Sequence, residues 1–539
     1  MTELRIPILD LCIIVAYILA ILLLGVLSSR KTKVTGQVYF LAGRSLPWGI
    51  VGAALFASNI STIHLVGLTA SGYNEGLVWG NFEWMAAFTL ILLSLVFAPF
   101  YFRSKISTLP EFLERRYGHA SRSILAFMAI VAALFIHIGM SLYAGAVVFE
   151  RFFGINVNAS ILIVAAAVSI YTVFGGLRAV VVTESVNTVV LLAGACCITA
   201  FAIAALPAHG IHSLAQFRSS VKPLQLNMLQ AHSTAGLNWY AVFLGYPVLG
   251  VWYWCTDQTI VQRVLGARTE RDAELGPLFA GFLKILPVFL LVLPGVIAYV
   301  LFRDQIGTDS NQTLPVLIAR LIPSGLKGVI AAAVLAALMS AVSAALNSSG
   351  TLVAVDIVKR MRPGIGDSGL VLTGRISSVI IMILAILWST QGGRFSSIFA
   401  AINVIASDLA PPITTVFLFG VFWRRGTREA SVVTLLAGFF MGAVSFVLDL
   451  PVFGRTKLIT DGLGISFLMQ AWWMFCICCG IFIIVSLLTP APAEESIRGL
   501  TWQNPLSVVF GKPLASLVDP RIFAGLLLTT MAILYVIFR

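Results

Sequence analysis

The sequence predicts an all-α integral membrane protein with about fourteen transmembrane helices, and this prediction rests on composition and on the length of the apolar runs. Hydrophobic residues make up 59% of the 539 residues, charged residues make up 11%, and the mean hydropathy is +0.97. Soluble domains are about half apolar and about a quarter charged. Apolar windows of about 20 residues, long enough for a helix to cross a bilayer, recur along the whole chain.

The predicted spans follow one another from end to end. The first is expected to be a retained helix, because its leading segment MTELRIPILD carries mixed charge and no small-residue cleavage site, unlike a signal peptide. Each later span is an apolar run bounded by charged or turn-forming residues. In order, the spans cover residues 8–28, 48–72, 79–102, 123–149, 156–174, 180–206, 237–261, 277–302, 327–357, 371–390, 395–422, 430–449, 465–488 and 521–538.

A single domain, residues 1–539, accounts for this arrangement. The longest connecting segments are 207–236, 303–326 and 488–520, and each is too short to fold independently.

Lysine and arginine residues predict the orientation, because they concentrate on the cytoplasmic side of membrane proteins. With the N-terminus outside, most of the 35 basic residues fall in cytoplasmic loops, including the one that holds Arg263, Arg268 and Arg271. The C-terminus then also lies outside, and we expect a multi-pass protein of the plasma membrane. The net charge of +12 reflects this excess of basic residues in cytoplasmic loops, which anionic lipids of the bilayer attract. No nucleic-acid partner is predicted.

Motifs of enzymes and metal centres are not found in a supporting context. This holds for HExxH, GxSxG, Walker A and the dinucleotide-binding fingerprint. The seven cysteines lie in or at the ends of spans, with no histidine at zinc spacing, which favours packing roles. We therefore do not expect an enzyme.

A polar cluster interrupts the second span, in the stretch AALFASNISTIHLVGL at 53–68. A single Asn or Ser in a transmembrane helix usually bonds a neighbouring helix. Several polar side chains together, flanked by glycines, instead predict a discontinuous helix whose free carbonyls and half-helix ends bind an ion and a substrate. The cluster consists of Ser58, Asn59, Ser61, Thr62 and His64.

Lys284 lies well inside another predicted span, in GFLKILPVF. A charge at this depth costs about 2.5–3.5 kcal/mol on insertion scales unless it is paired or hydrated. Three acidic residues are candidate partners, namely Glu83, Glu184 and Asp257. A structural ion pair is the alternative to a role in binding.

Three aromatic residues, Trp252, Tyr253 and Trp254, precede Asp257 directly. Their flat amphipathic rings predict either a surface that stacks on a ligand or a belt at the membrane interface.

The span at 327–357 is rich in small residues. Ala337, Ser340, Ala341 and Ala344 recur at helical spacing, which lets another helix approach closely. Ser340 and Ser343 add hydroxyl oxygens on nearly the same face. Because a small hard cation needs several oxygen ligands at short range, this helix beside the broken span is a candidate sodium site, with helix packing alone as the alternative.

Long blocks in a fixed order are similar to the sodium/solute symporter family, and most similar to the sodium/glucose cotransporters. They are FASNISTIHLVGL, FEWMA, STLPEFLERRYG, IYTVFGGLRAVVVTE, WYWCTDQTIVQR, GFLKILPVFLLVLPG, NSSGTLVAVDIVKR, DLAPPITTVFLFGVFWRR and LTWQNPL. The resemblance implies a LeuT-like core of five-plus-five inverted repeats at 48–206 and 237–422. The helix at 8–28 would lie outside this core, and further helices at 430–538 would follow it.

The resemblance also implies a sugar site and two gates. The expected substrate-binding residues are Asn59, His64, Glu83, Tyr253, Trp254, Lys284 and Asn403. The expected gate residues are Leu68, Phe82 and Phe399 on the outer side and Tyr253 on the inner side. Asn403 stands where the family has glutamine, so this shorter amide has to reach the substrate differently.

For sodium, the family pattern points to backbone carbonyls and two hydroxyls. The matching positions are Ala57, Ile60, Ala337 and Ser340. Ala341 stands where the second serine is expected. The loss of this hydroxyl puts the affinity for sodium, and the coupling of transport to sodium, in doubt. Ser343 and Glu184 match a second sodium region of some relatives, and provide either a displaced ion site or a proton acceptor.

The predicted function is sodium-coupled import of a sugar such as glucose or galactose by alternating access, with Na⁺ as the coupling ion. Two alternatives remain. The first keeps the fold but transports inositol or another polyol, or couples to protons, as Ala341 and Asn403 suggest. The second is a sugar-responsive sensor or channel that does not concentrate solute.

Overall fold

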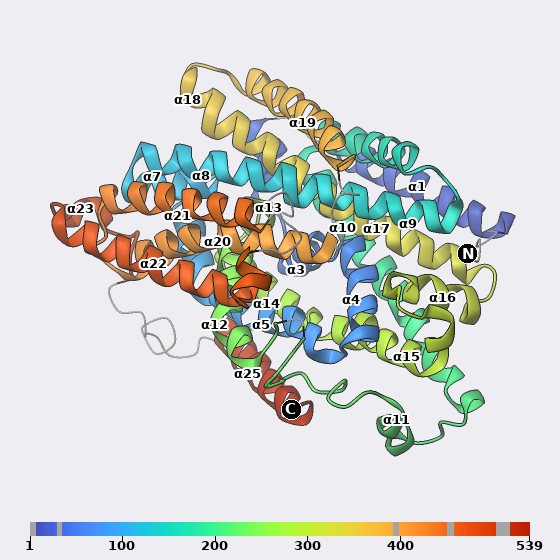
Figure 1. The fold of residues 1–539 in the computed structure, drawn as a ribbon. Coiled ribbons are helices and arrows are strands. Elements are labelled where there is room, and N and C mark those ends of the chain that lie inside the picture. The colour runs from blue at the N-terminus through green and yellow to red at the C-terminus, as the bar shows by residue number, and fades with distance from the viewer. Residues whose placement is uncertain (1–6, 30–34, 235, 392–397, 450–457, 503–517) are drawn as a thin grey trace.

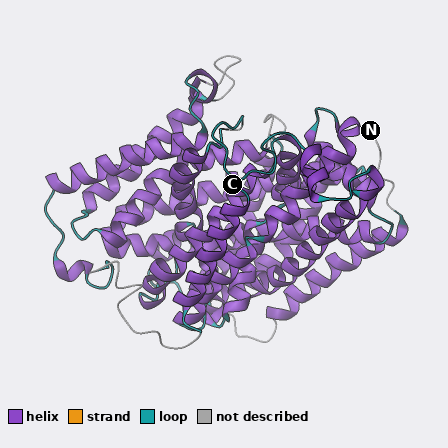
Figure 2. Ribbon diagram, turned by 90° about the horizontal axis from the view of Figure 1, so that it is seen from below, coloured by secondary structure: helices purple, strands orange, loops and turns teal. Residues whose placement is uncertain are grey.

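The described chain is entirely helical, with loops between the helices (Figure 1, Figure 2). The structure is a computed structural model and describes residues 7–29, 35–234, 236–391, 398–449, 458–502 and 518–539. The long helices run roughly side by side across Figure 1, while α4, α12 and α25 cross them at steeper angles. No strand is formed by the residues that the structure describes, as the sequence predicts.

Most of the long helices lie on the predicted spans. Their bounds are α1 (Ile8–Ser29), α2 (Gly36–Leu41), α3 (Trp48–Asn59), α4 (Thr62–Asn74), α5 (Asn81–Leu92), α6 (Ala98–Arg103), α7 (Leu109–Tyr117), α8 (His119–Ala132), α9 (Ser141–Phe153), α10 (Val157–Ala205), α11 (Leu214–Ser220) and α12 (Trp239–Gly250). The second half contains α13 (Gln258–Leu265), α14 (Glu270–Leu283), α15 (Leu293–Ile306), α16 (Thr313–Leu321), α17 (Leu326–Thr351), α18 (Lys359–Met361), α19 (Asp367–Ser389), α20 (Ile398–Phe422), α21 (Arg428–Leu448), α22 (Phe467–Leu488), α23 (Glu494–Ile497) and α25 (Pro520–Ile537).

Several helices continue into π-helical turns, which lie at η3 (Leu93–Phe97), η4 (Ala133–Met140), η6 (Val251–Thr256), η7 (Val288–Val292) and η9 (Leu352–Val358). A further π-helical turn is η11 (Leu458–Gly462). Short 3₁₀ segments lie at η1 (Ala42–Arg44), η2 (Leu77–Gly80), η5 (Pro207–His209) and η8 (Ser310–Gln312).

Eleven helices of the described chain are long and apolar enough to cross a membrane, or up to twelve if the bent pair α3–α4 is one span. Part of the difference from fourteen lies in α10, which covers the predicted spans 156–174 and 180–206 as one helix with a kink at Gly176 (φ 61°, ψ −161°). Another part lies at 237–261, where α12, η6 and α13 are individually short. The protein is therefore a multi-pass membrane protein, and the count of fourteen stays a prediction.

Burial sorts the helices into a centre and a lipid-facing shell. Residues of α17 are almost all buried, whereas α1, α21, α22 and α25 expose large apolar side chains, including Leu23 at 59% and Val536 at 76%. Such exposed apolar surface suits a bilayer and would be costly in water. The polar residues of α17 thus lie at the centre of the molecule, against α3, α10 and α13.

Close contact between α4 and α15 depends on a pair of glycines. A Cβ atom on Gly72 would lie 2.1 Å from the carbonyl oxygen of Val292, and one on Gly295 would lie 2.0 Å from that of Thr69. Both neighbours are backbone atoms, so an added methyl group can be accommodated only if the helices move apart.

We expect Gly72→Ala to lower the free energy of unfolding by about 1–3 kcal/mol, the usual cost of overpacking. Gly525→Ala is the matched control, because a Cβ on this helical glycine meets nothing within 4 Å. It should be neutral or slightly stabilising, since alanine favours helix. Unfolding of the two purified variants in the same detergent checks this, and equal stability would show that α4 and α15 are loosely packed.

Candidate functional site

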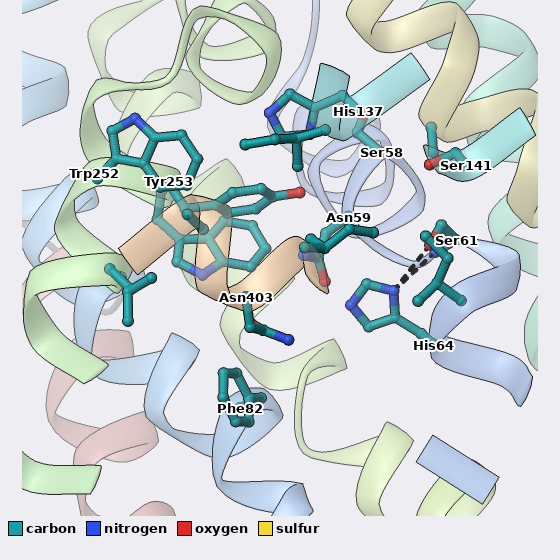
Figure 3. Close-up of a pocket in the computed structure, with 18 of the residues that line it drawn as sticks. Ser58, Asn59, Ser61, His64, Phe82, His137, Ser141, Trp252, Tyr253 and Asn403 are labelled. Atoms are coloured by element: carbon teal, nitrogen blue, oxygen red, sulfur yellow. Dashed lines mark hydrogen bonds between the residues drawn. The ribbon is translucent and has the colours of Figure 1, made fainter. Parts of the chain in front are cut away.

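A central pocket lies where the α3–α4 helix breaks (Figure 3). Its walls come from α3, α4, α5, η4, α12, η6, α17 and α20. The lining residues on which the argument depends are Ser58, Asn59, Ser61, His64, Phe82, Glu83, His137, Trp252, Tyr253, Trp254, Ala341 and Asn403. The pocket therefore brings together polar, charged and aromatic side chains from widely separated parts of the chain.

The break itself is made by Ile60 and Ser61, which both have extended backbone between α3 and α4, and the two half-helices meet at 63°. Ser61 caps α4 through a reciprocal pair of bonds with His64. The Ser61 N–H donates to His64 Nδ1 at 3.2 Å, so the imidazole carries its proton on Nε2. Nε2 lies 3.9 Å from Glu83 Oε1, which is too long for a direct hydrogen bond.

Lys284 lies at a second interruption, where α14 ends before η7. Pro287 follows three residues later and lacks the N–H that would continue the helix. The Lys284 ammonium donates to the Glu83 carboxylate and to Asn59 Oδ1, and it lies 5.5 Å from the centre of the Trp254 ring. Lys284 and Glu83 are each only 1% exposed. Glu83 is therefore the partner of Lys284 among the three candidates that the sequence left open.

The aromatic wall of the pocket is formed by η6, the π-helical turn between α12 and α13. Trp252 and Trp254 are buried inside the protein, and with Tyr253 they line the pocket, so the predicted alternative of an interfacial belt is wrong here. Asp257 has extended backbone after this turn, and its Oδ1 accepts from the Thr259 N–H at 2.6 Å, which caps α13. π-helical turns are frequent at functional sites.

Asp257 pairs with a histidine from another element. His137 Nε2 lies 3.0 Å from Asp257 Oδ2, and its ring is stacked near Trp252 with centroids 6.4 Å apart. Figure 3 places His137 beside Tyr253 at the wall of the pocket. Sequence reasoning missed His137, although an ionisable residue inside a predicted span is a signal for such a site.

Glu184 pairs with Arg263. The Arg263 Nη2 atom lies 2.6 Å from Glu184 Oε1, its Nε donates to Oε2 at 3.3 Å, and both side chains are fully buried. Ser58 also donates to Glu184 at 3.0 Å. The expectation that Arg263 lies in a loop is wrong, because it belongs to α13 and its side chain is buried against Glu184 of α10.

The residues predicted for sodium binding are all buried, and they are Ala57 on α3, Ile60 at the break, Glu184 on α10, and Ala337, Ser340 and Ser343 on α17. Thr62 Oγ1 donates to the carbonyl of Val334 at 3.1 Å, which holds the start of α4 against α17. Ser340 Oγ accepts from Asn187 at 2.8 Å, and Asn187 is another residue that sequence reasoning missed. The described part of the chain contains no cluster of three or more His, Cys, Asp or Glu side chains that could hold a metal.

The gate residues are placed as follows. Phe82 lines the pocket and stacks on Trp79 with ring centroids 5.7 Å apart, while Leu68 is fully buried and does not reach the lining. Asn403 lines the pocket from α20 and points into it in Figure 3. The side chain of Phe399 lies outside the described residues.

Comparison of the sequence with models of protein families gives a match to the sodium:solute symporter family over residues 39–438. A sodium/mannose cotransporter from Bos taurus is 35% identical over 95% of this chain and 93% of its own length. A sodium/glucose cotransporter 2 from Rattus norvegicus is 35% identical over 81% of this chain and 71% of its own length. A sodium/myo-inositol cotransporter 2 from Oryctolagus cuniculus is 31% identical over 92% of this chain and 78% of its own length.

Among solved structures, a Na⁺-coupled sialic acid symporter in a substrate-bound outward-open state has a TM-score of 0.77 at 20% identity, covering 90% of this chain and 99% of its own. MHP1, a nucleobase-cation-symport-1 family transporter, has a TM-score of 0.53 at 14% identity, covering 86% and 97%. These likenesses confirm the LeuT-like fold, and the repeat boundaries stay a prediction.

Proposed function

The chain belongs to the sodium:solute symporter family, and from this membership we propose that it imports a hexose or a related polyol together with Na⁺. The observation that carries the choice of substrate is the Glu83–Lys284–Asn59 network beside the aromatic wall of the pocket. Relatives named for mannose, glucose and myo-inositol, all of them polyols, support the same class.

Such a site suits a polyol for two reasons. Carboxylate, amide and imidazole groups on one side can pair several hydroxyls at once, and Tyr253 and Trp254 can cover the apolar ring face on the other. The 3.9 Å gap between His64 Nε2–H and Glu83 leaves room for a substrate hydroxyl that accepts from the imidazole and donates to the carboxylate. A buried site that pairs every hydroxyl rejects analogues lacking one.

Alternating access is the proposed mechanism. Sodium between the α3–α4 break and α17 would be held by the Ala57, Ile60 and Ala337 carbonyls and the Ser340 hydroxyl, and would favour the outward-open state. Phe82 and Leu68 would then close over the sugar, and release of sodium to the cytoplasm would free Tyr253. An ion shifts this equilibrium only by its difference in affinity between the two states. Each sodium entering gains about 2.3 kcal/mol per 100 mV, so transport is electrogenic.

The two halves of the core, 48–206 and 237–422, are proposed to be inverted repeats. Each half begins near a broken helix, the first at Ile60–Ser61 and the second at Asp257, which is what an inverted repeat requires. The helix at 8–28 would lie outside this core. We also propose a plasma membrane location, and the distribution of basic residues supports placing both termini outside.

Myo-inositol is the second candidate substrate, and the specific observation in its favour is Asn403 in the pocket wall, where the sugar-transporting pattern has glutamine. A shorter amide changes which hydroxyl can be reached. Two other functions are compatible with the missing hydroxyl at Ala341, which weakens the proposed sodium site. They are coupling of transport to protons, and a ligand-gated current without accumulation of solute.

The test is uptake of radiolabelled glucose, mannose and myo-inositol into proteoliposomes that contain the purified chain. An inward sodium gradient should drive concentrative uptake of one of these, increased by an inside-negative potential, while a matched potassium gradient should not. Equilibration regardless of cation, or accumulation driven by a pH gradient alone, would contradict sodium symport. Current without accumulation would identify the sensor or channel.

Ala341→Ser is expected to tighten sodium binding, because it returns a hydroxyl ligand next to Ser340. We expect the half-saturating sodium concentration for uptake to fall by about tenfold, equivalent to about 1.4 kcal/mol. Ala332→Ser is the matched control, because Ala332 is also buried on α17 but lies more than two helical turns before Ser340, and it should change the half-saturating concentration little. An unchanged value in Ala341→Ser would place the ion elsewhere.

A further inference from the structure

A chain of hydrogen bonds links the first helix to the proposed sodium site. The Tyr17 hydroxyl on α1 donates to Asn187 Oδ1 on α10 at 2.7 Å. Asn187 Nδ2 then donates to Ser340 Oγ at 2.8 Å and to the Ala336 carbonyl at 3.3 Å, both on α17. Asn187 and Ser340 are each 1% exposed, so these bonds are made away from water.

The chemistry of the partners determines which way the Asn187 amide faces. The Ala336 carbonyl can only accept, so the amide must present its NH₂ group to α17. Its oxygen then faces α1, where Tyr17 supplies the donor. Without the Tyr17 hydroxyl, the amide oxygen would lose the hydrogen bond that keeps the amide in this orientation, and a buried acceptor without a partner is costly.

The orientation of Asn187 in turn determines how the Ser340 hydroxyl is used. A serine oxygen has one hydrogen and two lone pairs. The Asn187 N–H occupies one lone pair from the α10 side, which leaves the second available to a cation. Since the Ala341 side chain carries no oxygen, Ser340 is the one hydroxyl left at the two positions where the family pattern has serines, and its orientation matters correspondingly more.

The first helix is also attached to α17 at a second point. Asp10 Oδ1 accepts from the Gly325 N–H at 2.8 Å and from the Gly328 N–H at 2.6 Å, which caps the beginning of α17. Asp10 and Tyr17 lie two helical turns apart on α1. The position of α1 along α17 is therefore defined, and the Tyr17 hydroxyl has a defined height relative to Ser340.

We propose that Tyr17 and Asn187 are positioning residues for the coupling ion, so that α1, although outside the repeats, contributes to sodium affinity. This inference rests on the proposed function, because it takes Ser340 as a sodium ligand. Tyr17 acts on the ion through Asn187 and Ser340 and does not touch it. Loss of an outer-shell partner commonly weakens metal binding by about 10–100-fold, and the lower end is expected for a weakly held ion.

The experiment measures the sodium dependence of uptake in proteoliposomes for Tyr17→Phe, Asn187→Ala, Ser340→Ala and the double variant Tyr17→Phe/Ser340→Ala. We expect Tyr17→Phe to raise the half-saturating sodium concentration about tenfold, with the sugar KM at saturating sodium unchanged. Asn187→Ala should shift it in the same direction. Tyr240→Phe is the matched control, because this tyrosine is partly exposed and bonds only the nearby Asn238 among the contacts described.

The double variant separates positioning from a general loss of stability. If Tyr17 acts through Ser340, removing Tyr17 in the Ser340→Ala background should change sodium dependence little further, so the two effects are not additive. The inference would be overturned if the effects of Tyr17→Phe and Ser340→Ala on sodium dependence were additive. It would also be overturned if Tyr17→Phe and Asn187→Ala both had the same sodium dependence as the parent protein. Both outcomes would leave the proposed function standing. Absence of sodium stimulation in the parent protein would instead overturn the proposed function.

Discussion

Lys284→Met is expected to reduce sugar uptake at least about 100-fold while the protein still reaches the membrane. Lys284 neutralises Glu83 in a site where both are almost fully buried, and it also holds the Asn59 amide at the end of α3. Removing one partner of a buried ion pair costs about 3–5 kcal/mol, because the other charge is left uncompensated. The uncompensated group here is the Glu83 carboxylate, which lines the substrate pocket, so both the stability of the protein and the binding of the substrate should decrease.

The controls for Lys284 follow from the same pair. Glu83→Gln/Lys284→Met removes both charges, so it should restore the stability of the protein but not its transport, because the groups that pair sugar hydroxyls are still missing. Lys359→Met, at an exposed position, should leave uptake unchanged. Uptake of radiolabelled sugar and thermal unfolding are measured on the same preparations. Near-parental uptake by Lys284→Met would show that the pair is structural only.

Arg263→Met is expected to lower the free energy of unfolding by about 3–5 kcal/mol. The guanidinium is fully buried, and it holds α13 against α10 through two contacts with Glu184. Glu184 also accepts from Ser58, so an unpaired charge there would disturb the end of α3 next to the ion site. Denaturant unfolding in detergent, with the protein's own tryptophans as the probe, measures the change.

An exposed ion pair in the same chain provides the comparison. Arg103 and Glu270 are 2.6 Å apart, but their side chains are 58% and 33% exposed. Arg103→Met should therefore cost no more than about 1 kcal/mol. Arg263→Met/Glu184→Leu, which removes both buried charges, should recover part of the lost stability. Equal effects of Arg263→Met and Arg103→Met would mean that water reaches the buried pair.

Local signals in the sequence were sufficient for much of the site. Polar residues at Ser58–Ser61 and a lysine in GFLKILPVF are costly in lipid, so their presence marks a break and a binding site without any knowledge of contacts. Similar reasoning could have found His137, which lies inside a predicted span. It could not find Asn187, because a single amide in a membrane helix more often serves packing.

Which buried charged residues pair with one another could not be predicted from the sequence. Glu83, Glu184 and Asp257 were equivalent candidates for Lys284, and Arg263 was assigned to a loop, since it directly follows an apolar run. In the folded protein Lys284 pairs with Glu83 across 201 positions, Arg263 with Glu184 across 79, and His137 with Asp257 across 120.

The amino-acid sequence by itself determined the membrane class, the break in the second span and, through its ordered blocks, the family, because hydropathy and backbone propensity are local properties. Only the tertiary structure decided which charges neutralise one another, that Arg263 is buried, and that Tyr17 reaches Ser340 through Asn187. These outcomes depend on which helices touch and at what height, and contacts between residues far apart in the chain leave no mark in the local pattern of a single sequence.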